Sequence, residues 1–92
     1  MDEDKQVLMA QVILGDEAEK FMKSDLGRYI KGRIDQDIQE LKDKLVEIDP
    51  EDINNIRKIQ NEIRLRNLVL NYFKELIIEG QQALQILQEE ER

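Results

Sequence analysis

A single proline divides this chain, and it is the feature that most constrains the fold. Pro50 is the only proline among 92 residues, and it stands in the sequence Asp49–Pro50–Glu51–Asp52. An aspartate N-cap followed by proline at the first helical position, with acidic residues in the first turn, is typical of a helix start. The sequence therefore predicts that a helix begins at Asp49–Pro50 and that the stretches on either side fold back on each other.

Both stretches carry the apolar pattern of helices that lie side by side. Upstream, apolar residues alternate spacings of four and three at Ile34, Ile38, Leu41, Leu45 and Ile48. Downstream, they recur every seven positions at Ile56, Ile63, Leu70, Ile77 and Leu84. These spacings are typical of a helix–helix seam and of a coiled-coil repeat. We predict an antiparallel, coiled-coil-like hairpin with long helices over residues 25–48 and 50–88.

Charge supports this pairing. Residues 35–52 hold eight acidic residues and two lysines, a balance of −6, whereas residues 53–74 hold five basic residues and one glutamate, a balance of +4. Facing residues of the hairpin have numbers that sum to about a hundred, which brings Arg64 and Arg66 near Asp35 and Asp37. The same register brings Arg57 near Asp43 or Glu40. Arg66 also occupies a seam position. It is therefore either partly buried with a carboxylate partner or marks a point where the seam turns aside.

The N-terminal segment, residues 3–22, is predicted to be helical as well. Residues 7–14 are almost uniformly apolar, which is typical of a buried helix or of a strand, and the absence of an evident partner strand favours the helix. Gly15 is predicted to end this helix, and Asp16 with Glu19 forms a capping-box pattern for a new turn. Ser24 is a further helix-start signal, so the first long helix begins there or continues with a kink from residue 17.

The second long helix has more apolar surface than one partner helix covers. It overhangs the first from about residue 74, and beyond residue 64 its apolar residues spread around most of its circumference. The N-terminal segment, a second copy of the chain or a target protein has to cover this surface. Gly80 admits either close packing or a break of the helix near residue 80. The candidate protein interface comprises Leu65, Leu68, Val69, Tyr72, Phe73, Leu76, Ile77 and Ile78.

Together these patterns predict one all-α domain over residues 1–92, either a three-helix bundle or an oligomeric bundle. The chain has no His and no Cys, so it lacks the usual general base, thiol nucleophile and transition-metal ligands. We therefore expect no enzyme activity, no catalytic residue, no cofactor and no metal site. The longest apolar run is far shorter than the roughly 20 residues that span a bilayer, and the acidic start differs from a secretory signal. We expect a cytoplasmic protein without membrane contact.

A basic cluster in the first third is the best candidate for nucleic-acid contact. It consists of Lys20, Lys23, Arg28, Lys31 and Arg33. Glu19 and Asp25 are interleaved with it, and the net charge of the chain is −7, which repels nucleic acid overall. Nucleic-acid binding by a small dimer of this protein is therefore only the alternative to the function favoured below. An acidic protein partner suits the cluster better.

Several short stretches resemble small helical proteins of tailed bacteriophages that have no assigned activity. They are Phe21–Tyr29, Asp49–Pro50, Ile59–Ile63, Glu75–Gly80 and Ala83–Leu84, so the resemblance spans roughly residues 15–87. It implies a virus-encoded protein of the host cytoplasm or the virion, and it carries over no functional residue. With the apolar overhang, it leads us to expect a non-enzymatic interaction or assembly module. Such a module would be a homo-oligomer that acts in virion assembly or on a host protein.

Overall fold

The computed structural model describes residues 2–91 and contains three α-helices joined by short connections. The helices are α1 (Asp2–Lys23), α2 (Asp25–Glu47) and α3 (Ile53–Glu90), and no strand occurs among the described residues. The all-α fold predicted from the sequence is confirmed. The ends of the predicted domain, Met1 and Arg92, lie outside the described residues.

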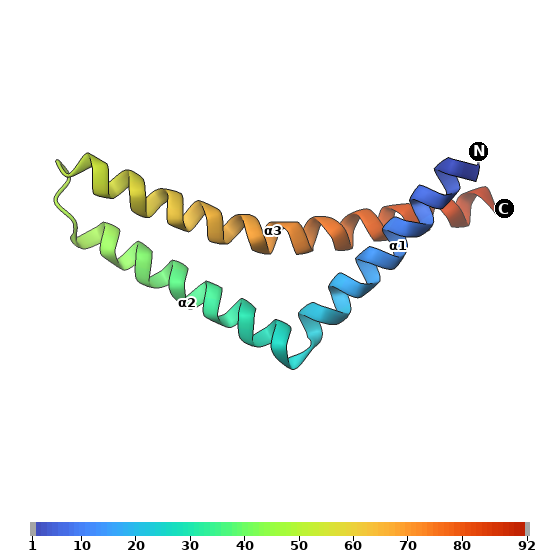
Figure 1. Ribbon diagram of the computed structural model, residues 1–92, viewed down its shortest axis with the longest axis horizontal. Helices are drawn as coiled ribbons and strands as arrows, with labels where there is room; N and C mark the ends of the chain where they lie inside the picture. Colours follow the sequence, from blue (N-terminus) through green and yellow to red (C-terminus); the bar gives the residue numbers. More distant parts are fainter. Residues whose placement is uncertain (1, 92) are drawn as a thin grey trace.

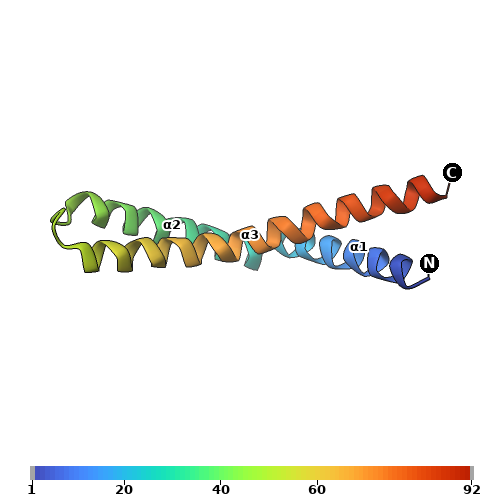
Figure 2. The same ribbon diagram turned by 90° about the horizontal axis from the view of Figure 1, so that it is seen from above.

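The two shorter helices lie one after the other along α3, which runs the length of the molecule (Figure 1). α2 packs antiparallel on the first half of α3, and α1 returns across the second half, where it makes most of its contacts. The turn between α2 and α3 lies at one end of the molecule, and both termini lie at the other (Figure 2). The molecule measures 60 × 28 × 17 Å. α1 therefore partly covers the overhang that the α2–α3 hairpin alone would leave.

The turn around the proline differs from the prediction. α3 begins at Ile53, and its N-cap is Asp52, whose carboxylate accepts hydrogen bonds from the backbone N and the side-chain Nδ2 of Asn55 at 3.5 and 2.7 Å. The carboxylate of Asp49 instead accepts from the backbone N of Glu51 at 2.9 Å. The predicted start at Asp49–Pro50 is therefore three residues too early. Asp49 closes an Asx turn, so the second aspartate caps the helix.

Gly15 and Gly80 both lie inside uninterrupted helices. α1 continues through Gly15 and α3 through Gly80, so the predicted helix end at Gly15 and the break near residue 80 are both wrong. The two glycines meet where α1 crosses α3. A Cβ added to Gly15 would lie 2.7 Å from the carbonyl oxygen of Leu76 and 2.9 Å from the Cα of Gly80. The close-packing alternative for Gly80 is thus the one that the structure shows.

Ser24 forms the corner between α1 and α2. Its Oγ accepts a hydrogen bond from the backbone N of Gly27 at 3.0 Å, which caps α2. A Cβ on Gly27 would collide with the carbonyl of Phe21, so the tight corner requires glycine at this position. Of the two starts that the sequence left open, α2 begins directly after Ser24.

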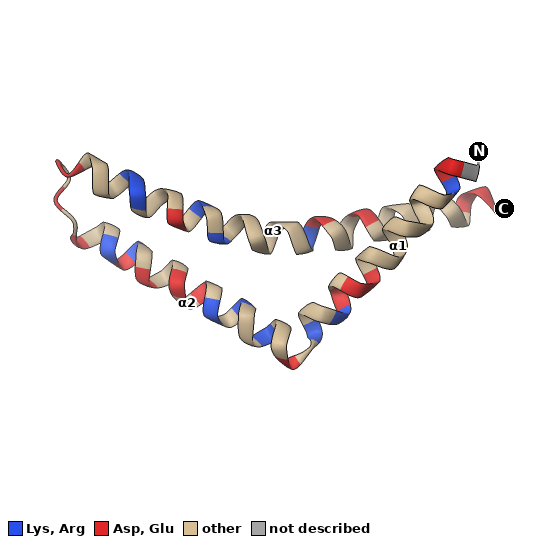
Figure 3. Cartoon of the chain, viewed as in Figure 1, with Lys and Arg blue, Asp and Glu red and all other residues tan. Residues whose placement is uncertain are grey.

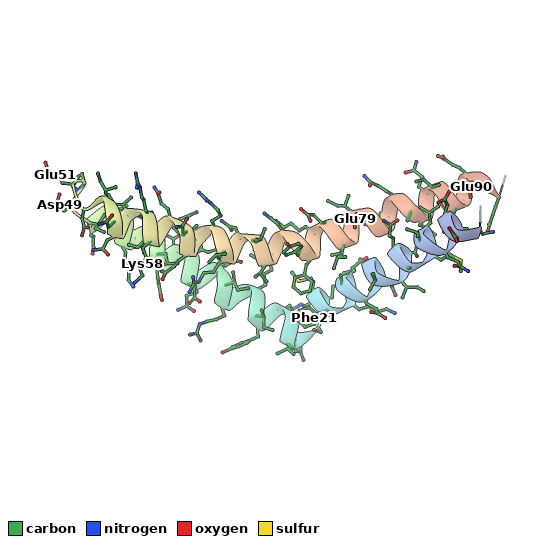
Figure 4. The ribbon with its side chains drawn as sticks, turned by 45° about the horizontal axis from the view of Figure 1, so that its top comes forward. Phe21, Asp49, Glu51, Lys58, Glu79 and Glu90 are labelled. Atoms are coloured by element: carbon green, nitrogen blue, oxygen red, sulfur yellow. The ribbon has the colours of Figure 1, made fainter. Side chains whose placement is uncertain are left out.

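The core is a thin line of side chains along α3. Its buried hydrophobic residues are Ala18, Ile38, Leu41, Leu70 and Ala83, and no polar side chain is buried among the described residues. Near the corner, the ring of Phe21 stacks on that of Phe73 with centroids 5.2 Å apart, below the middle of α3 (Figure 4). Since none of the large side chains is fully enclosed, the hairpin has little buried surface to stabilise it.

Candidate functional site

Three of the eight predicted interface residues are used within the chain. Phe73 stacks on Phe21, the carbonyl of Leu76 lies against Gly15, and Ile77 lines a surface hollow of about 260 Å³ beside the glycine crossing. Each of the three side chains is half-buried. These residues therefore hold α1 on α3 and are not free for a partner.

Four others form one exposed face in the middle of α3. Leu65, Leu68, Val69 and Tyr72 are 61, 46, 46 and 58% exposed. Their separations of three, four and seven residues place them side by side on a helix. We call these four residues the α3 stripe. Ile78 is also exposed, but its position six residues after Tyr72 turns it away from the stripe.

The stripe belongs to a chain with an unusually large surface. The accessible surface is 7522 Å², whereas a compact monomer of 10.9 kDa has about 5,600 Å². The radius of gyration of 18.7 Å likewise exceeds the roughly 12 Å of a globular chain of this length. The extended arrangement therefore leaves an excess of about 1,900 Å² in contact with water.

α1 contributes exposed apolar side chains where the sequence pattern predicts buried ones. Val7, Met9, Ile13 and Leu14 are 49–58% exposed, so the expectation of a buried helix over residues 7–14 is wrong for them. α3 covers only one side of α1, and a segment that is apolar all round needs more than one neighbour. Tyr29 and Leu26 on α2 are also exposed and were not predicted as interface residues.

The predicted basic cluster is largely paired with carboxylates on the same helix. Four of its side chains form ion pairs one turn away, at 2.8–3.4 Å: Lys20 with Asp16, Lys23 with Glu19, Lys31 with Asp35 and Arg33 with Asp37. Hydrogen bonding to Asp16 raises the pKa of Lys20, and hydrogen bonding to Asp37 and Tyr29 raises that of Arg33. The carboxylates offset the positive potential that phosphate binding needs.

Arg28 is the remaining member of the cluster. It lines a hollow on the outer side of α2 with Tyr29, Gly32, Arg33 and Gln36. The hollow exists because Gly32 has no side chain and nothing within 4 Å of its Cβ position. The structure therefore brings Arg28 and Arg33 together but gives them no further cationic neighbour at this hollow.

Arg66 is paired as the hairpin register predicts. Its Nε lies 3.6 Å from Oδ2 of Asp37 on α2, and its Nη1 donates to the carbonyl of Glu62 at 3.1 Å. The two side chains are 36 and 32% exposed, so the first alternative for Arg66, partial burial with a carboxylate, is confirmed. Arg64 forms no ion pair among the described residues. Arg57 likewise forms none within residues 2–91, so only one of the three predicted contacts across the hairpin is made.

The described residues offer neither a membrane span nor a carboxylate metal site. Within residues 2–91, no helix is both long and apolar enough to cross a bilayer. No group of three or more acidic side chains there is placed to hold a metal ion. Comparison with protein-family models, with curated proteins and with solved structures found no significant match to this chain.

Proposed function

We propose that this protein is a non-enzymatic interaction and assembly module that binds another polypeptide through the α3 stripe. The observation that carries the proposal is a cluster of four large apolar side chains, each about half exposed, on one face of a helix. Soluble monomers rarely expose a contiguous apolar patch of more than a few hundred Å² unless it is functional. Tyr72 is the candidate anchor because aromatic residues dominate binding energy at protein interfaces.

The position of the stripe also supports this proposal. It lies on the side of α3 that faces away from α1 and α2, in the middle of an unbroken helix. A rigid helix that presents apolar residues at spacings of three and four suits a second helix as partner. The resemblance to bacteriophage proteins favours a narrower form of the proposal, in which the partner is a virion component or a host protein.

Site-specific photo-crosslinking tests this function. Tyr72 is replaced by a photoreactive phenylalanine analogue, and the chain is irradiated in the cells that express it. Tyr29 provides a matched control, because it is the same residue type, is 67% exposed and lies on the outer face of α2. We expect protein adducts from position 72 and none from position 29. The additional change Leu65→Asp should abolish the adducts by placing a charge in the stripe.

Circular dichroism of each variant checks that the helices are retained. Adducts from position 29 alone, or adducts from position 72 that persist with Leu65→Asp, would contradict the proposal. Adducts to any polypeptide, including another copy of this chain, satisfy it.

A further inference from the structure

The charges of α3 are divided between its two halves. Residues 53–74 carry five basic residues and one glutamate, a balance of +4, whereas residues 75–90 carry four glutamates and no basic residue. Figure 3 shows the blue segments of α3 from the turn to just past its middle, with one red segment among them, and red segments without blue from there to the end of the helix. The α3 stripe lies close to the boundary between the two halves.

The stripe is flanked by one charge of each sign on its own face. Lys58, Leu65, Tyr72 and Glu79 follow one another at intervals of seven residues, and all four are exposed. Residues seven apart share a face of a helix, with a drift of about 20° per interval that a left-handed supercoil takes up. Figure 4 labels Lys58 on the turn half and Glu79 on the terminal half. The face therefore reads cation, apolar centre, anion along the helix.

We propose that the occupant of the α3 stripe is a second copy of this chain, whose α3 lies antiparallel to the first about a two-fold axis between Leu68 and Val69. In this register Leu65 of each copy faces Tyr72 of the other, and Lys58 faces Glu79. Leu68 and Val69 each lie beside their own counterparts. This inference rests on the proposed function and names its partner.

Charge complementarity selects the antiparallel direction. The positive half of each α3 lies along the negative half of the other, which favours association. A parallel pair would instead place Glu79 beside Glu79 and Lys58 beside Lys58, and like charges at facing positions destabilise a pair of helices. The two-fold symmetry repeats each favourable contact, because the patch on one copy is complementary to the same patch on the other.

The extended shape of the chain leaves surface available for such a dimer. A stable interface of standard size takes about 800 Å² from each partner. The extended chain exposes about 1,900 Å² more than a compact monomer of its mass, and the stripe is flanked by further exposed surface along α3. α3 is gently bowed (Figure 1), but it presents its face without an intervening loop, since it is unbroken from Ile53 to Glu90.

Cysteine crosslinking tests the partner and the direction together, because the chain has no cysteine of its own. The variants Lys58→Cys and Glu79→Cys are oxidised separately and as a mixture. A disulfide forms only where the two Cα atoms approach within about 7 Å. We expect little crosslinking of either variant alone and strong crosslinking in the mixture. Leu68→Cys, next to the axis, should crosslink to itself.

Lys74→Cys mixed with Glu79→Cys is the matched control. Lys74 is an exposed lysine on the same helix, but its position two residues after Tyr72 turns it away from the stripe. We expect no crosslink from this mixture. Charge reversal gives a second readout by sedimentation: Lys58→Glu or Glu79→Lys should each weaken the dimer about tenfold, and the double reversal should restore it. Lys74→Glu should leave the dimer unchanged.

Two results would overturn the inference. Crosslinking of Lys58→Cys and Glu79→Cys each to itself would show that the helices pair in parallel. A chain that sediments as a monomer up to high concentration, with no crosslink in the mixture, would show that a second copy is not the partner. In the latter case adducts from position 72 to a different protein would still uphold the proposed function, so the two failures are distinguishable.

Discussion

Gly15 and Gly80 touch through their backbones where α1 crosses α3: a Cβ added to Gly80 would lie 3.0 Å from the Cα of Gly15 and 3.0 Å from the carbonyl oxygen of Gln11. No described glycine has a positive φ, so the backbone conformation does not require glycine here. These two positions require it because a side chain would clash with the facing helix. The buried residues Ala18 and Ala83, one turn further along each helix, extend this small-residue contact. The contact sets how closely α1 approaches α3.

The substitution Gly15→Ala should therefore destabilise the protein by about 1–3 kcal/mol, because the new methyl group meets the backbone of α3, which cannot give way as a side chain can. Urea unfolding followed by far-UV circular dichroism measures the change. Gly32→Ala is the matched control: its Cβ would have open space around it, so it should stabilise α2 by up to about 1 kcal/mol through helix propensity. Equal effects of the two substitutions would show that the crossing is not closely packed in solution.

The glycines also show why the sequence predicted only part of this fold. A local rule assigns Gly15 to a helix end, since glycine commonly follows a helix, and the local sequence contains nothing that distinguishes an end from a crossing. The signal lies in two segments that are distant in the chain, the pairs Gly15 with Ala18 and Gly80 with Ala83, each separated by three residues. Only the register of α1 on α3 shows that they meet.

The parts that were predicted correctly depend on patterns repeated along the chain. The α2–α3 hairpin follows from many apolar residues in one register, and that register placed Arg66 next to Asp37. The candidate site was predicted less well because exposure depends on which helix covers which face. Phe73, Leu76 and Ile77 belong to the same apolar band as Leu65 and Tyr72, and only the path of α1 separates them.

The difference between the covered residue Ile77 and the exposed residue Leu65 can be measured by replacing each with alanine. Ile77→Ala should lower the free energy of unfolding by about 2 kcal/mol, because Ile77 lies in the contact between α1 and α3. Leu65→Ala should change that energy by less than about 0.5 kcal/mol in dilute protein, since Leu65 is 61% exposed. Association measured by sedimentation should respond in the opposite order. A loss of stability for Leu65→Ala as large as that for Ile77→Ala would place the stripe inside the folded monomer.

The pair formed by Arg66 and Asp37 should contribute little to stability. Both side chains are about one-third exposed, so Asp37→Asn should cost less than about 1 kcal/mol, and added salt should reduce the difference. Arg66→Leu should be neutral or stabilising, because it continues the apolar seam between Ile63 and Leu70. Thermal unfolding of both variants at low and high salt measures these effects. A destabilisation of more than about 2 kcal/mol by Arg66→Leu would show that the charge itself is required.

The two aspartates around the proline should differ in their contribution to α3. Asp52→Ala removes the N-cap hydrogen bond to Asn55 and should destabilise the protein by about 1 kcal/mol. Asp49→Ala removes only the exposed Asx-turn bond to Glu51, so it should cost a few tenths of a kcal/mol. Urea unfolding of the two variants under identical conditions gives the comparison. A larger destabilisation by Asp49→Ala than by Asp52→Ala would mean that α3 starts at Pro50 in solution, as the proline rule alone predicts. In that case an additional helical turn would replace the Asx turn.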